Sequence, residues 1–138
     1  MRVVLDTNVL VSALIFPGGK PETVYRRALD GSIVLITTAA LLAELGRVLQ
    51  TKFDWAETRV EEAVAQLVRV GEVAKPARRL AVIANDPADN AVLEAAIAGG
   101  ATVIVSGDRH LLDLGAYEGV RILDAARFLS QFGASSPR

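Results

Sequence analysis

Four acidic side chains in this sequence are spaced so that one site could collect them. Asp6 and Asp108 each directly follow a short run of apolar, mostly branched residues. Asp89 falls in the first turn of an expected helix, and Glu44 sits beside the apolar stripe of another. Two carboxylates about 4 Å apart repel by roughly 4 kcal/mol at an effective dielectric of 20, so a cluster needs a strong counter-charge. Divalent cations supply it, and an all-carboxylate site suits Mg²⁺ or Mn²⁺.

Each of these residues also has an ordinary structural interpretation. Asp6 could cap the helix that follows it, since Asp is a favoured N-cap residue. Glu44 could form a surface ion pair with Arg47, three residues further along, worth a few tenths of a kcal/mol. The functional interpretation therefore depends on these residues meeting in space.

The elements that must position them alternate along the chain. Strands are expected at 3–5, 33–36, 102–105 and 120–123, with a short one at 72–75. Helices are expected at 7–14, 21–29, 56–70 and 109–114. Three more are expected: one capped by Thr37 or Thr38 with its apolar stripe at 41–49, one that starts in the turn 85–90 and ends at 99–100, and one capped by Asp124 that ends near 131. Residues 52–55 should interrupt the helices, and 80–84 fit either a strand or an extended loop. This alternation predicts an α/β fold, a three-layer α/β/α sandwich with a mostly parallel central sheet. If strands 3–5 and 102–105 are neighbours, Asp6 and Asp108 project from the same edge of that sheet.

The length and composition of the chain limit its domain organisation and the classes of site that it can contain. The 138 residues suit one domain, expected over 1–132, with a frayed tail at 133–138. There is no cysteine, which excludes disulfides and thiolate chemistry. No apolar run is long enough to cross a membrane and no signal-peptide pattern opens the sequence, so we expect a cytoplasmic protein. A formal net charge of −1 gives no bulk attraction to a polyanion. The hydrophobic fraction of 51% is high, and we predict that the excess covers a homodimer interface.

Four segments together resemble a known family. They are Val-Leu-Asp-Thr-Asn-Val-Leu-Val-Ser-Ala (4–13), the helix that carries Glu44, Asp-Pro-Ala-Asp-Asn (86–90) and Ile-Val-Ser-Gly-Asp-Arg-His-Leu-Leu (104–112). In this order and spacing they are similar to PIN-domain nucleases, above all to VapC toxins of toxin–antitoxin systems. The resemblance spans the chain to about residue 130.

The resemblance implies a function and a site. It implies an endoribonuclease that cleaves single-stranded RNA with water activated by one or two Mg²⁺ or Mn²⁺ ions, and a small antitoxin protein that covers the acidic cleft. The metal-binding and catalytic residues that it implies are Asp6, Glu44, Asp89 and Asp108, with the polar side chains of Asn8 and Ser106 beside them.

One position departs from the family pattern. Many relatives carry an acidic residue where Ala88 stands, which leaves open whether Asp86 assists Asp89. The spacing of Asp89 from the apolar stripe of the following helix favours Asp89, and Asp86, which precedes a proline, is typical of a turn.

Several other residues have a functional and a simpler interpretation. Lys20 and Arg109 could contact RNA phosphates, or could be a solvated loop lysine and a surface ion-pair partner. His110, the one histidine, is expected to be a solvated residue at a helix start. Phe53 and Trp55 are expected to pack between helices rather than to stack on bases.

Two other classes of protein compete with the nuclease. A catalytically silent PIN-like module would bind RNA or protein, but all four acidic positions are present, which argues against a dead site. A phosphoryl-transfer domain using Asp6 as nucleophile usually carries a second Asp two residues later, where this chain has Asn8. Cleavage of RNA that depends on Mn²⁺ would separate the nuclease from the silent module. An aspartyl adduct formed with a phosphoryl-mimicking fluoride complex and Mg²⁺ would identify the phosphoryl-transfer domain.

Overall fold

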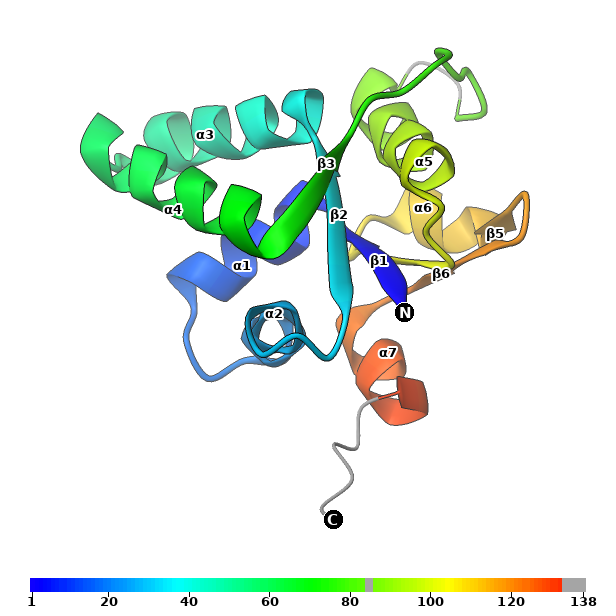
Figure 1. Ribbon diagram of the computed structural model, residues 1–138, viewed down its shortest axis with the longest axis horizontal. Coiled ribbons are helices and arrows are strands. Elements are labelled where there is room, and N and C mark those ends of the chain that lie inside the picture. Colours follow the sequence, from blue (N-terminus) through cyan, green and yellow to red (C-terminus); the bar gives the residue numbers. More distant parts are fainter. Residues whose placement is uncertain (84–85, 133–138) are drawn as a thin grey trace.

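The computed structural model describes residues 1–83 and 86–132, and the expected tail at 133–138 lies outside them (Figure 1). In chain order the elements are β1 (Arg2–Leu5), α1 (Thr7–Ile15), α2 (Lys20–Leu29), β2 (Val34–Thr38), α3 (Ala39–Phe53), α4 (Glu57–Val70), β3 (Gly71–Ala74), α5 (Pro87–Gly99), β4 (Val103–Val105), α6 (Arg109–Leu114), β5 (Ala116–Tyr117), β6 (Val120–Leu123) and α7 (Ala125–Phe132). Within these residues, no helix combines the length and the apolar character needed to cross a membrane.

The strands form one sheet in the order β3-β2-β1-β4-β6-β5. All neighbouring pairs are parallel except β5 with β6. The first strand lies at the centre, with Val4 opposite Ile36 of β2 on one side and Ile104 of β4 on the other. This arrangement confirms the predicted mostly parallel sheet and the predicted neighbours β1 and β4.

The sheet is covered on both faces because apolar side chains alternate along its buried strands. Val3 and Leu5 of β1 pack in a core with α1, α2, α3, α4 and α7, whereas Val4 packs in a second core with α5 and α6. Figure 1 shows α3 and α4 on one side of β2 and α5 on the other. The predicted three-layer α/β/α sandwich is therefore confirmed.

Most element boundaries lie within two residues of the prediction, but the end of α3 and the strand β5 differ from it. Helix α3 continues through Lys52 and Phe53, because neither residue breaks a helix. It ends where Asp54 adopts a left-handed conformation with φ of 55°. The two-residue strand β5 was not predicted, because so short a segment has no periodic pattern. The described part of 80–84 is a loop without regular structure.

A close contact between a helix and a strand fixes the position of α5. A Cβ atom added at Gly99 would overlap with Cγ2 of Ile36 on β2, so only glycine lets the end of α5 lie this close to the sheet. Gly100 then ends the helix in a left-handed conformation with φ of 64°. Because α5 packs this closely against β2, its first turn is held at the carboxyl end of the sheet.

Candidate active site

One buried hydroxyl connects the ends of the two central strands. Asp6 occupies the N-cap position of α1, but its side chain makes no capping hydrogen bond. Instead, Oδ2 of Asp6 accepts a hydrogen bond of 2.7 Å from Oγ of Ser106, a fully buried residue just after β4. The same Oγ accepts a hydrogen bond of 2.9 Å from the backbone N–H of Asp108. The side chain of Asp6 therefore does not cap α1, although the residue occupies the N-cap position, and its carboxylate is held at the strand ends.

The loop between β4 and α6 is fixed from both sides. Oδ1 of Asp108 accepts hydrogen bonds from the backbone N–H groups of His110 (2.8 Å) and Leu111 (3.3 Å), which caps α6. Oδ1 of Asn8 accepts a hydrogen bond of 3.3 Å from the backbone N–H of Gly107. Asn8 therefore supports the loop that carries Asp108.

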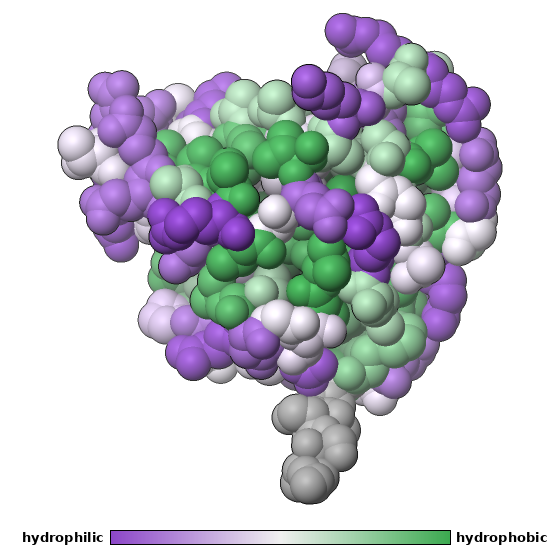
Figure 2. Space-filling view, viewed as in Figure 1, coloured by the Kyte–Doolittle hydropathy of each residue, from purple (hydrophilic) through white to green (hydrophobic). Residues whose placement is uncertain are grey.

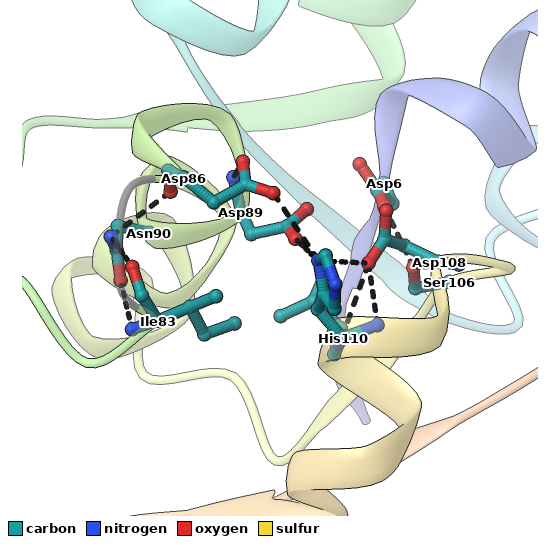
Figure 3. Close-up of polar contacts among 9 residues, drawn as sticks. Asp6, Ile83, Asp86, Asp89, Asn90, Ser106, Asp108 and His110 are labelled. Carbon is teal, nitrogen blue, oxygen red and sulfur yellow. Dashed lines mark hydrogen bonds and ion pairs between the residues drawn. The ribbon is translucent and has the colours of Figure 1, made fainter.

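The first turn of α5 brings two more carboxylates to this place (Figure 3). Asp86 caps the helix, with Oδ1 accepting a hydrogen bond of 3.1 Å from the backbone N–H of Asp89. The amide of Asn90 holds the preceding segment through hydrogen bonds to the backbone oxygens of Ile83 (2.8 Å) and Asp86 (3.0 Å). Asp89 is 5% exposed, and its buried Oδ2 has no hydrogen-bond partner among the described residues.

His110 turns its ring toward these carboxylates. Its Nδ1 lies 3.6 Å from Oδ2 of Asp86, 3.8 Å from Oδ2 of Asp89 and 4.0 Å from Oδ1 of Asp108. The side chain is 66% exposed, as expected for a helix start, but it also belongs to the acidic cluster. The spacing along the chain is a partial signal for this position, because His110 lies two residues after Asp108. The approach of α5 could not be inferred from that spacing.

A single cleft of about 740 Å³ joins the four acidic residues expected from the sequence: Asp6, Glu44, Asp89 and Asp108 all line it. Glu44 is held by Arg47 through hydrogen bonds of 2.7 to 2.9 Å, and this partner lowers the pKa of Glu44. Both interpretations of Glu44 therefore apply, since it lines the cleft and forms the surface ion pair.

Comparison with known proteins agrees with this geometry. Residues 2–110 match the family model described as PIN domain, a range that includes every carboxylate of the cluster. The chain is a PIN-domain protein. It is also similar to the uncharacterized protein MJ1680 of Methanocaldococcus jannaschii, with 30% identity over 118 residues, which are 83% of this chain and 75% of the archaeal protein. PIN domains form a superfamily of nucleases, typically metal-dependent.

The electrostatics of the PIN domain's cleft fit a bound cation. Burial, with the neighbouring carboxylates of Asp86 and Asp108, raises the pKa of Asp89 to about 8. Burial also raises the pKa of Asp6, and the hydrogen bond from Ser106 opposes that rise. The pKa of Asp86 is lowered, chiefly by the backbone N–H of Asp89. A dication would neutralise these carboxylates and supply the partner that Oδ2 of Asp89 lacks within the described residues.

The basic and aromatic residues of the PIN domain's cleft are not the ones expected. Lys20 and Arg109 are exposed at the starts of α2 and α6, and neither is among the described residues that line the cleft. The cleft is lined instead by Lys52, Phe16 and Phe53. Phe16 is 60% exposed and Phe53 36% exposed, so the prediction that Phe53 packs between helices is wrong. Trp55 is half-buried against the core, and its predicted packing is confirmed.

Proposed function

We propose that this PIN domain is a metal-dependent endoribonuclease that cleaves single-stranded RNA in the cleft. The observation that carries the proposal is the meeting of Asp6, Glu44, Asp89 and Asp108 around one cavity, with a buried carboxylate oxygen of Asp89 that has no partner in the described chain. Such a set of oxygen atoms suits Mg²⁺ or Mn²⁺, as one ion or two.

The residues of the cleft have distinct roles in this proposal. Asp6, Glu44, Asp89 and Asp108 are the metal-binding and catalytic side chains. They would hold a dication, which would supply activation of water and stabilisation of the leaving oxygen of the phosphodiester. Ser106 keeps the carboxylate of Asp6 aimed at the cleft, and Asn8 holds the loop before Asp108. Glu44 exchanges its partner Arg47 for the ion when the ion binds.

The aromatic lining of the cleft supports single-stranded RNA as the substrate. Phe16 and Phe53 line the cleft with partly exposed rings, and unpaired bases stack on such rings at about 1–3 kcal/mol each. Lys52, which also lines the cleft, supplies a positive charge for a phosphate. Paired bases cannot stack in this way, so a duplex should be a poor substrate. Lys20 and Arg109 remain proposed phosphate contacts only for RNA that extends beyond the cleft.

The direct test is cleavage of RNA by protein stripped with EDTA and reloaded with Mn²⁺ or Mg²⁺. A labelled single-stranded RNA should be cut, leaving 5′-phosphate and 3′-hydroxyl ends, and the matched duplex and single-stranded DNA serve as comparisons. Asp6→Asn should lower the rate at least about a hundredfold, since even outer residues of metal sites are worth about 10- to 100-fold. Asp113→Asn, an exposed position on α6, is the control. Full activity of Asp6→Asn would refute the assignment.

We also propose that the chain acts as the toxin of a toxin–antitoxin pair in the cytoplasm, where its RNA substrate is found. The motif resemblance supports this role, and the exposed Phe16 and Phe53 offer an apolar surface that an antitoxin could cover together with the cleft. Induced expression in bacteria should then arrest growth with the native chain and not with Asp6→Asn. Continued growth with the native chain, at a level of protein that cleaves RNA in extracts, would contradict the toxin role.

We further propose that residues 1–132 form one domain that pairs with a second copy through the face carrying α4 and β3. Figure 2 shows hydrophobic side chains at the centre of the face that carries these elements. Val68 of α4 is 47% exposed and Val73 of β3 is 43% exposed. Light scattering at micromolar concentration should give the mass of a dimer, and that of a monomer for Val68→Glu. A monomeric native chain would contradict the dimer.

A further inference from the structure

We propose that Asp86 and His110 join Asp89 in holding a cation, and that the imidazole makes this position selective for transition-metal dications over Mg²⁺. The inference rests on the proposed nuclease function in one respect, because the unpartnered Oδ2 of Asp89 is the oxygen that the ion of the cleft would also bind. It brings in two side chains, Asp86 and His110, that the acidic quartet does not contain.

The first observation is the geometry of the three ligand atoms. One carboxylate oxygen of Asp86, one of Asp89 and Nδ1 of His110 all lie within 4.8 Å of one another. Donor atoms bound about 2.1 Å from one tetrahedral ion lie roughly 3.4 Å apart. The distances from Nδ1 to Oδ2 of Asp86 and of Asp89, 3.6 and 3.8 Å, are longer than hydrogen bonds and close to this spacing. Small side-chain rotations would therefore place all three atoms around one ion.

The second observation is independent of the clustering. Oδ2 of Asp89 is the oxygen that faces His110, and it is buried without a hydrogen-bond partner among the described residues. A buried acceptor with no partner costs roughly 1–3 kcal/mol, more if it is charged. The other oxygens of the site are already oriented, because Oδ1 of Asp86 accepts the backbone N–H of Asp89 and leaves Oδ2 free to face the ring (Figure 3). The orphaned oxygen therefore points to a missing ligand at this position.

The third consideration is the chemistry of the donor set. Mg²⁺ prefers oxygen ligands and retains its water shell, whereas imidazole nitrogen suits Zn²⁺, Co²⁺ and other later dications. Two carboxylates with one imidazole leave open positions on the ion for water or substrate. The ring of His110 is itself accessible, being 66% exposed, so an ion can reach Nδ1 from solvent. The site should therefore distinguish metals that the acidic quartet alone would bind with less discrimination.

The chain offers an unusually direct test, since His110 is its one histidine. In protein labelled with ¹⁵N, the imidazole gives a single pair of ring-nitrogen resonances. Zn²⁺ added to metal-free protein should displace the Nδ1 resonance and leave Nε2 with the smaller change, and Mg²⁺ at saturation should move neither by a comparable amount. An unmoved Nδ1 resonance in saturating Zn²⁺, or a change centred on Nε2, would overturn the proposal.

Affinity measurements on variants provide the second readout. By calorimetry, His110→Asn should weaken Zn²⁺ binding at least about tenfold and Mg²⁺ binding less than about twofold. His110→Asp, which replaces the nitrogen by oxygen, should bring the two affinities closer together. Asp113→Asn, on the exposed side of the same helix, should change neither. Equal Zn²⁺ affinity in the native chain and His110→Asn would refute the site.

The two proposals fail separately. Asp6→Asn removes a residue of the proposed nuclease but none of the three ligands, so it should keep the Zn²⁺-induced change at Nδ1 of His110. If RNA is never cleaved while this change persists, the cation site stands and the nuclease proposal falls. If RNA is cleaved and the change is absent, the reverse holds.

Discussion

Replacing Asp89 by Asn should change how the stability of the metal-free protein depends on pH. The folded protein raises the pKa of Asp89 from its ordinary value of 3.8 to about 8. Between these values the folded protein keeps the proton and the unfolded chain does not. The stabilisation from this group is therefore complete below about pH 4 and is lost as the pH rises through about 8. Asparagine has nearly the same shape as the protonated carboxyl but cannot ionise.

The size of the effect follows from the same numbers. A rise from 3.8 to about 8 corresponds to at most roughly 6 kcal/mol, at about 1.4 kcal/mol for each tenfold change in proton affinity. Asp89 shares its protons with the neighbouring carboxylates of Asp86 and Asp108, so we expect about 2–3 kcal/mol to appear at this position. For a protein of this size, that corresponds to roughly 6–10 °C in melting temperature.

The assay is thermal or urea unfolding in EDTA at pH 5 and at pH 8.5. The melting temperature of the native protein should fall relative to Asp89→Asn over this interval, so that the variant is the more stable protein at pH 8.5. Asp113→Asn is the matched control, because it removes an exposed acidic side chain outside the cleft. Saturating Mn²⁺ should restore the native protein and leave Asp89→Asn little changed. Native and variant curves that stay parallel from pH 5 to 8.5 would refute the account of the cluster.

Three further substitutions test other parts of the structure. Ser106→Ala removes the hydrogen-bond donor to Asp6, so it should raise the pKa of that carboxyl further. In urea unfolding at neutral pH, the free energy of unfolding should fall by about 1–3 kcal/mol. An unchanged free energy would show that the buried hydrogen bond is not formed. Gly99→Ala should lower the free energy of unfolding by about 1–3 kcal/mol, because the added methyl group overlaps with the side chain of Ile36 on β2. Thermal unfolding measures this, and an unchanged stability would contradict the close packing of α5. Arg47→Gln removes the ion-pair partner of Glu44 and leaves its carboxylate available to the metal ion. The Mn²⁺ concentration for half-maximal RNA cleavage should therefore fall about two- to fivefold, since an exposed ion pair is worth roughly 0.5–1 kcal/mol. A rise in that concentration would show that Arg47 helps to hold the ion.

The fold was largely predictable because local patterns agree with the tertiary structure. Each inner strand is a short run of apolar residues, and each helix has a stripe at helical spacing. The meeting of Asp6 and Asp108 followed from topology alone, since adjacent parallel strands end at the same edge of a sheet. The end of α3 was harder, because it depends on the left-handed conformation of Asp54 rather than on a proline or glycine.

The site was predictable where it depends on strand ends or on spacing within one helix, and not where it depends on how two helices approach each other. Glu44 and Asp89 were placed from helical spacing, and both line the cleft. The contact of His110 with Asp86 arises from the approach of α5 to α6, which spacing along the chain does not encode. For the same reason Lys52 was not recognised as a cleft residue, since its position depends on how α3 packs beside α1.

The hydrogen bond from the hydroxyl of Ser106 to the carboxylate of Asp6 joins two residues 100 positions apart in the chain. During synthesis Ser106 is therefore added 100 residues after Asp6. Before Ser106 is in place, the carboxylate of Asp6 has no hydroxyl group to orient it, and the end of β4 is not yet beside the end of β1. A growing chain therefore cannot assemble the acidic cluster of the cleft until β4 and the loop that carries Ser106 and Asp108 have been made and folded.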